Sequence, residues 1–497
     1  MSNAGPAFAP PIGSRHNEVC EPRKALHRRF SSARRRGCQN DNDSDNMKLF
    51  ARDALLPAGW ARDVVIDVGL DGNIRTVEAA FTRPSDAEHV QGALVPGMPN
   101  VHSHAFQRAL AGLTERGGPK ADDFWTWRTE MYRFLDRIDP DDQEAIATQL
   151  YLEMLKAGYT TVGEFHYLHR DPRGRSYANP AEMALRIQAA AETTGIGLTL
   201  LPVFYAHANF GGAPPLPEQR RFVHDTGSFH ALLAALALDG LKLGVAPHSL
   251  RAVTPAELSE IAAFARGYDD DAPIHIHAAE QQKEVEDCIS WSGARPVEWL
   301  IEHAGVDPRW CIVHATHMSD DETARLAATG AVAGLCPTTE ADLGDGVFPS
   351  RAYFAAAGRL GIGGDSHVGV DPFLELRLIE GAQRLTLRRR NVLARDGEST
   401  GLALYRAALA GGAQALAQPV GAIEVGRRAD FLVLNGDDPA LAEQPAAHLL
   451  DAAIFGPARH VVRDVMVAGR WVIGDGHHAD EEAILIRYRQ TIKRLLS

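Results

Sequence analysis

The feature that most constrains the fold is a regular alternation of short apolar runs and helix-length segments through the middle of the chain. Strand–helix alternation requires a parallel sheet, and eight such units are enough to close that sheet into a (β/α)8 barrel. We therefore predict an α/β fold with a TIM-like barrel at 94–417. Its eight strands are expected at 92–95, 160–164, 197–203, 242–246, 274–277, 311–314, 331–335 and 360–363.

The two ends of the chain have a different pattern, with short alternating runs that are typical of antiparallel strands. Two of these runs flank the turn Asp71-Gly72-Asn73, as a hairpin would require. We predict that 47–93 and 418–480 form one small β-sandwich domain, and that 481–497 form a C-terminal helix. Residues 1–46 are rich in arginine and polar side chains, and we expect them to be disordered or a non-native extension.

Composition excludes some classes of partner and favours a compartment. The net charge of -13 argues against non-specific binding of nucleic acid, which needs a basic surface. No apolar run reaches the roughly 18 residues that would indicate a membrane span. The five cysteines are odd in number and show no CxxC spacing, which favours a reducing compartment, so we expect a cytoplasmic protein.

Histidine and aspartate recur at the ends of four of the expected strands. His102 and His104 follow the first strand, His275 and His277 end the fifth, His314 ends the sixth, and Asp365 follows the eighth. In a (β/α)8 barrel these strand ends meet at one mouth, and imidazole and carboxylate groups are ligands for zinc. The pattern predicts a metal site, although spacing alone leaves His275 and His277 equivalent because both lie on one face of a strand.

This arrangement resembles the amidohydrolase superfamily, as does the return segment Val425-Gly426-Arg427-Arg428-Ala429-Asp430-Phe431-Leu432-Val433. The resemblance implies one divalent metal, most often zinc, with Glu280 as proton shuttle and His314 orienting the attacking group. It implies four metal ligands: His102, His104, His277 and Asp365. The binuclear members carry a lysine on strand four. The run Gly197 to Phe204, taken here as that strand, has none, so the site is expected to be mononuclear.

The chemistry of such a site is hydrolytic. A metal with an open position lowers the pKa of bound water to about 7, and Asp365 can take the proton during attack. Glu280 can then protonate a departing nitrogen, which must leave as an amine. The predicted reaction is attack on a planar carbon that bears nitrogen.

Longer motifs narrow the resemblance to the formimidoylglutamate deiminases of histidine breakdown, which convert N-formimino-L-glutamate to N-formyl-L-glutamate and ammonia. The matching segments are Pro99 to Arg108, Phe124 to Arg128, Glu164 to Tyr167, His248 to Val253 and His277 to Glu284. Arginine forks suit a substrate with two carboxylates. By this resemblance the substrate-binding residues are Gln107, Arg128, Tyr167, His248 and Arg251. A homodimer is also implied.

Two positions depart from the family pattern, and two other functions stay open. Asp342 stands where asparagine is expected and Gly364 where serine is expected, so an extra carboxylate near the pocket could weaken affinity for an anion. One alternative is a deaminase of nucleobases or other amidine and guanidine compounds, which would favour an uncharged aromatic pocket. The other is a catalytically inactive barrel with an assembly or regulatory role, which would be expected to have lost ligands.

Overall fold

The structure is a computed structural model that describes residues 46–79, 82–115, 124–237 and 241–497. The prediction for residues 1–46 therefore lies outside the described residues except for residue 46. The first strand, β1, begins at Met47.

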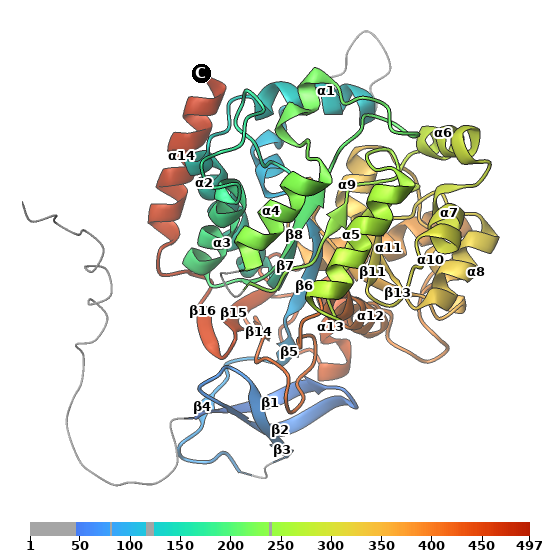
Figure 1. The fold of residues 1–497 in the computed structure, drawn as a ribbon. Helices are drawn as coiled ribbons and strands as arrows, with labels where there is room; N and C mark the ends of the chain where they lie inside the picture. Colours follow the sequence, from blue (N-terminus) through green and yellow to red (C-terminus); the bar gives the residue numbers. More distant parts are fainter. Residues whose placement is uncertain (1–45, 80–81, 116–123, 238–240) are drawn as a thin grey trace, which may run out of the picture. The chain divides into compact units, whose positions relative to one another are not determined.

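Eight parallel strands in the middle of the chain form the predicted barrel (Figure 1). Their order is β10-β11-β12-β13-β6-β7-β8-β9, and parallel bridges Val245–Ile274 and Ser249–His277 bring the two edges together. Nearly every residue of these strands is buried, as expected where both faces of a parallel sheet are covered. The strands are β6 Met98–Ser103, β7 Tyr159–His166, β8 Gly197–Phe204, β9 Ala246–Pro247, β10 Ile274–Ala278, β11 Trp310–His314, β12 Val332–Leu335 and β13 Arg359–Ile362.

Helices connect and surround these strands (Figure 1). Several begin at strong caps: Ser319 and Glu322 form a capping box at α8, and Thr254 and Glu257 form another at α5. The helices are α1 Phe124–Leu135, α2 Pro140–Ala157, α3 Glu182–Thr194, α4 Thr226–Leu236, α5 Pro255–Tyr268, α6 Gln282–Ser292, α7 Pro296–His303, α8 Asp320–Thr329, α9 Pro337–Asp342, α10 Ser350–Ala355, α11 Pro372–Leu387, α12 Thr400–Ala415, α13 Ala446–Phe455 and α14 Glu481–Leu496, with 3-10 turns η1 Ala105–Leu110 and η2 Pro217–Arg221.

Two strand assignments made from sequence were wrong. The run at 92–95 is not the first barrel strand: Leu94–Pro96 forms β5, which pairs in the other sheet with β14 (Phe431–Leu434) and β1 (Met47–Leu56). The first barrel strand is β6, which starts only two residues later, and apolar character alone cannot say which sheet a short run joins. The run Gly197–Phe204 is the third barrel strand rather than the fourth, and the fourth strand, β9, is followed by His248 rather than a lysine.

Both ends of the chain contribute to a separate sheet, as predicted. Its strands lie in the order β16-β15-β14-β5-β1-β2-β3, with β4 pairing on β1, so hydrogen bonds join them into one mixed sheet rather than two separately bonded layers. Leu49, Ile66 and Phe431 are fully buried in its core. The strands are β1 Met47–Leu56, β2 Gly59–Val68, β3 Ile74–Ala79, β4 Glu88–His89, β5 Leu94–Pro96, β14 Phe431–Leu434, β15 Val462–Val467 and β16 Arg470–Ile473.

Two further sequence expectations concern helices and cysteines. Among the described residues, none of the helices combines the length and apolar character that crossing a bilayer would need. Cys288, Cys311 and Cys336 are buried and unpaired.

Candidate metal centre and active site

Three imidazoles converge at the carboxyl end of the barrel strands. The Nε2 atom of His102, in β6, lies 3.1 Å from Nε2 of His104 and 3.1 Å from Nε2 of His277, in β10. The Oδ1 atom of Asp365 lies 3.3 Å from His104 Nε2 and 3.5 Å from His102 Nε2. Ligand atoms around a tetrahedral zinc with bonds of about 2.0–2.1 Å would be about 3.3–3.4 Å apart, so this donor set fits one metal ion.

Backbone pairing brings Asp365 to the histidines. The residue follows β13, the eighth barrel strand, and its amide donates to the carbonyl of His102 over 3.0 Å. The amide of His104 donates in turn to the carbonyl of Asp365 over 3.2 Å. Asp365 has a φ of 48°, in the left-handed region, so the chain turns sharply as its carboxylate enters the mouth.

The outer nitrogens of two ligands fix their tautomers. His104 Nδ1 donates to the carbonyl of Phe165 over 2.9 Å, and His277 Nδ1 donates to the carbonyl of His248 over 3.0 Å. Both Nε2 atoms are therefore unprotonated and face the shared centre. Burial, with His104 beside it, lowers the pKa of His102 to about 3, so this imidazole is neutral at neutral pH, as a metal ligand must be.

The structure separates the two histidines that spacing left equivalent. His275 lies on the same strand face as His277 but deeper in the barrel, where its Nε2 donates to the carbonyl of Ala415 over 2.7 Å. It is fully buried and takes no part in the cluster of ligand atoms. His277 is the histidine of this pair that can hold a metal.

Glu280 and His314 lie beside the ligand cluster, and both are almost fully buried. His314 Nε2 is 3.8 Å from Glu280 Oε1 and 3.8 Å from Asp365 Oδ2, while its Nδ1 donates to Glu340 over 3.2 Å. Burial alone would lower the pKa of His314, but the three carboxylates raise it to about 10. Burial also raises the pKa of Glu280, opposed by His314 and Arg251, so this carboxyl keeps a proton to higher pH than an exposed glutamate does.

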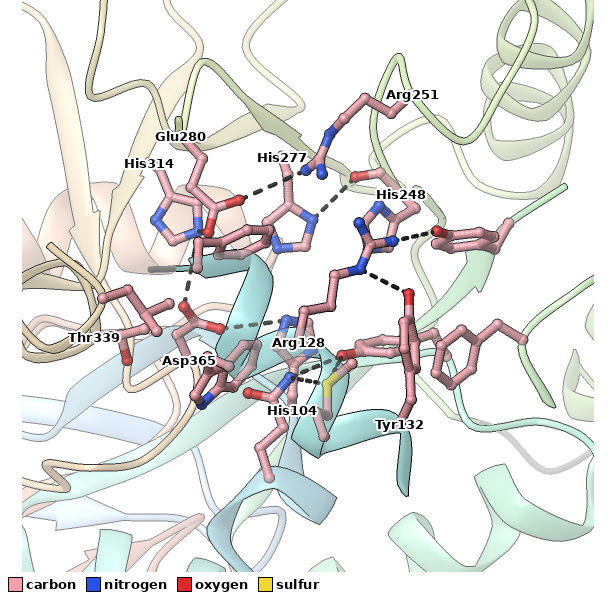
Figure 2. A pocket seen from close by; sticks show the side chains of 18 residues that line it. His104, Arg128, Tyr132, His248, Arg251, His277, Glu280, His314, Thr339 and Asp365 are labelled. Carbon is pink, nitrogen blue, oxygen red and sulfur yellow. Dashed lines mark hydrogen bonds and ion pairs between the residues drawn. The ribbon is translucent and has the colours of Figure 1, made fainter. Parts of the chain in front are cut away.

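A pocket opens above this cluster, and Figure 2 shows Arg128 and Arg251 facing it from the side opposite His314 and Asp365. Arg128 donates from Nε to Tyr132 and from Nη2 to the hydroxyl of Tyr205. Arg251 is 7% exposed, and its Nη2 lies 3.7 Å from Glu280 Oε2. The five residues expected from sequence to bind substrate all line the pocket: Gln107, Arg128, Tyr167, His248 and Arg251.

Some residues of the site were missed from sequence. Tyr132 lies one helical turn after Arg128, and Tyr205 follows the end of β8, at the active face of the barrel, so both positions offered a signal. No sequence signal marked Glu340, because its role depends on its contact with His314. A buried network behind the ligands was also missed: Glu164 accepts from Ser103 Oγ over 2.5 Å and from the Ala105 amide over 2.7 Å.

The two departures from the family pattern have different surroundings. Asp342 is exposed at the end of α9 and does not line the pocket, whereas its neighbour Leu343 does. Gly364 is packed closely: a Cβ there would lie 2.6 Å from Nδ1 of His367. The carboxylate of Asp342 therefore does not face the pocket. Because Gly364 has no Cβ, the side chain of His367 can pack against its backbone.

Comparison with known proteins agrees with this geometry. The model of the amidohydrolase family matches residues 93–472, and a model of the N-terminal domain of formimidoylglutamate deiminase HutF matches residues 47–89. A formimidoylglutamate deiminase from Pseudomonas aeruginosa is 54% identical over 453 residues, which are 90% of this chain and 99% of that protein.

Solved structures show the same fold. The crystal structure of an amidohydrolase from Brucella melitensis is 48% identical, with a TM-score of 0.85 over 91% of this chain and 100% of that one. An adenosine deaminase from Xanthomonas campestris, solved with bound zinc, is 24% identical with a TM-score of 0.74, covering 91% and 98% of the two chains. The chain therefore belongs to the amidohydrolase family and, within it, to the formimidoylglutamate deiminases, hydrolases that act on C–N bonds.

Proposed function

We propose that the protein is a zinc-dependent deiminase that hydrolyses N-formimino-L-glutamate to N-formyl-L-glutamate and ammonia, a step of histidine degradation. The observation that carries the proposal is a pocket in which two arginines face a His3Asp cluster. The similarity to the Pseudomonas aeruginosa deiminase supports the same reaction.

The arginines favour a substrate with two carboxylates. Among the described residues, Arg128 has only neutral hydrogen-bond partners, and the one carboxylate paired with Arg251 is Glu280, at 3.7 Å. Each guanidinium therefore keeps N–H donors that a bidentate carboxylate can use. A pocket for an uncharged nucleobase would gain nothing from two desolvated cations, which is why we place that alternative second.

The proton transfers follow from the positions of three side chains. The bound metal would supply a Lewis acid that makes water nucleophilic at neutral pH, held by His102, His104, His277 and Asp365. Asp365 would accept a proton from the attacking water. Glu280, which burial disposes to carry a proton, can deliver it to the nitrogen so that ammonia leaves. His314, anchored by Glu340, directs Nε2 at both carboxylates and can orient the attacking water or polarise the electrophile.

The test is release of ammonia from a panel of formimino, guanidino and nucleobase compounds by the metal-loaded protein. We expect turnover of N-formimino-L-glutamate, lost in Asp365→Ala. Absence of turnover on this compound by protein with a full metal complement would refute the proposal. Preferred turnover of a nucleobase would establish the alternative.

Elemental analysis tests the identity and the amount of the bound metal. Zinc is proposed because the donors are three imidazoles and a carboxylate, a set this ion favours. Elemental analysis of the purified protein should find about one zinc per chain, and a protein unable to bind any transition metal would favour an inactive barrel. The homodimer and the cytoplasmic location stay predictions.

A further inference from the structure

The guanidinium of Arg128 is held by neutral groups on its Nε edge. Tyr132, on α1, accepts from Nε over 2.7 Å (Figure 2). Tyr205, after β8, accepts from Nη2 over 2.8 Å. Arginine has five N–H donors, so with these two bonds Nη1 and the second hydrogen of Nη2 have no hydrogen-bond partner among the described residues. No carboxylate in the described part of the chain pairs with Arg128, so its positive charge stays available to a ligand.

A buried glutamine fixes the two hydroxyls. Gln219, in η2, is 1% exposed, and its Oε1 accepts from the Leu216 amide over 2.8 Å. That bond orients the side-chain amide, so its NH2 group faces the tyrosines: Nε2 lies 2.7 Å from the Tyr205 hydroxyl and 3.5 Å from that of Tyr132. One loop residue therefore sets the geometry of both partners of Arg128.

The hydrogen bonds within this cluster leave at least one O–H group without an acceptor. The Tyr205 oxygen accepts from Arg128 and Gln219, which fills its two acceptor positions. Its own O–H can turn to Tyr132, the neighbouring hydroxyl, but then the O–H of Tyr132 has no described acceptor. At least one hydroxyl hydrogen of the pair therefore has no acceptor among Arg128, Gln219 and the two tyrosines, and it lies beside a guanidinium that lines the pocket.

We propose that Gln219, Tyr132 and Tyr205 form a neutral clamp that aims Arg128 at one carboxylate of the substrate and adds one O–H donor to it. This inference rests on the proposed function and deepens it, since it assigns residues that decide how a dicarboxylate is selected. Hydroxyls suit this role better than carboxylates would. They orient a guanidinium as acceptors, but they leave its charge available to the ligand.

The test compares Tyr205→Phe and Gln219→Leu with the wild type. Tyr353→Phe is the matched control, because it removes a buried hydroxyl that bonds to the Ala331 carbonyl elsewhere in the barrel. The substrates are N-formimino-L-glutamate and two analogues that each lack one carboxylate, N-formimino-L-norvaline and N-formimino-4-aminobutyrate. Metal content and Tm are measured for every variant.

The clamp predicts a selective effect on KM. For Tyr205→Phe, the KM of N-formimino-L-glutamate should rise about 10- to 150-fold, the range for losing a hydrogen bond to a charged group, with a smaller change in kcat. The same rise should appear with one analogue and be absent with the other, which lacks the carboxylate that Arg128 holds. In an Arg128→Met background, Tyr205→Phe should add less than about threefold, since the clamp acts largely through that arginine.

Binding of N-formyl-L-glutamate, measured by calorimetry, separates failure of the clamp from failure of the proposed function. If the wild type binds this compound but has no deiminase activity, a weaker Kd in Tyr205→Phe still supports the clamp. If the wild type turns over substrate and Tyr205→Phe leaves KM and Kd within twofold, the clamp is overturned while the function stands. Equal effects on both analogues, or a wild type that binds no dicarboxylate, would also overturn it.

Discussion

Replacing Arg251 by methionine tests the assignment of a dicarboxylate substrate most directly. Arg251 is 7% exposed, and its Cζ lies 6.0 Å from the ring centroids of Phe124 and Trp125. Methionine keeps an unbranched apolar stem of similar length against these rings and removes the charge. The change therefore deletes the interaction with a substrate anion while leaving most of the packing in place.

The expected magnitude follows from what Arg251 contacts. Its one ion pair among the described residues is with Glu280 at 3.7 Å, too long for a strong hydrogen bond, so its donors are available to the substrate. Loss of a hydrogen bond to a charged group costs about 1.5–3 kcal/mol, which corresponds to a rise in KM of about 10- to 150-fold. A change in kcat is also expected, because Arg251 lies beside Glu280 and opposes the rise in the pKa of that carboxyl.

The assay is steady-state ammonia release from N-formimino-L-glutamate, with metal content and Tm recorded for each protein. Arg389→Met, in the exposed run Arg388 to Arg390, is the matched control and should leave KM unchanged. A KM for Arg251→Met within about threefold of the wild type, in a folded and fully metallated protein, would refute the role of this arginine. It would then favour an uncharged substrate.

Three further predictions concern the metal, the core and pH. His277→Ala should abolish the rise in Tm that zinc causes when it is added to metal-free protein. His275→Ala should keep that rise but lower the free energy of unfolding by about 1–3 kcal/mol, because it loses the hydrogen bond to the Ala415 carbonyl. The reverse pattern would contradict the assignment of His277 as the ligand. Gly364→Ser should cost about 1–3 kcal/mol in urea unfolding because its Cβ would lie 2.6 Å from Nδ1 of His367, and an unchanged midpoint would show that His367 moves freely. Burial raises the pKa of Glu375 despite the bonds from Thr338, so the folded state keeps this proton to higher pH than the unfolded state does. Its stabilising contribution is complete below about pH 4.5 and declines as pH rises above that value. Glu375→Gln should therefore flatten this decline in unfolding free energy above about pH 4.5, and an unaltered slope would count against it.

Much of the architecture could be read from the sequence because local patterns encode it. Strand–helix alternation predicts a barrel whatever the details of packing, and the mouth of a barrel collects the residues that follow its strands. The residue types at these positions, imidazole and carboxylate, then limit the chemistry to metal-assisted hydrolysis. The family motifs identified five candidate substrate-binding residues, and all five line one pocket.

The tertiary structure decided what depends on distances between segments far apart in the chain. The alternation of side chains puts His275 and His277 on one face, but only the packed barrel shows that one reaches Ala415 and the other reaches His102. Likewise, the run Leu94–Pro96 is as apolar as a barrel strand, and its partners alone place it in the other sheet. The roles of Tyr205 and Gln219 depend on the packing of β8 and η2 next to Arg128. A hydrogen bond requires two residues, and a local sequence pattern identifies only one of them.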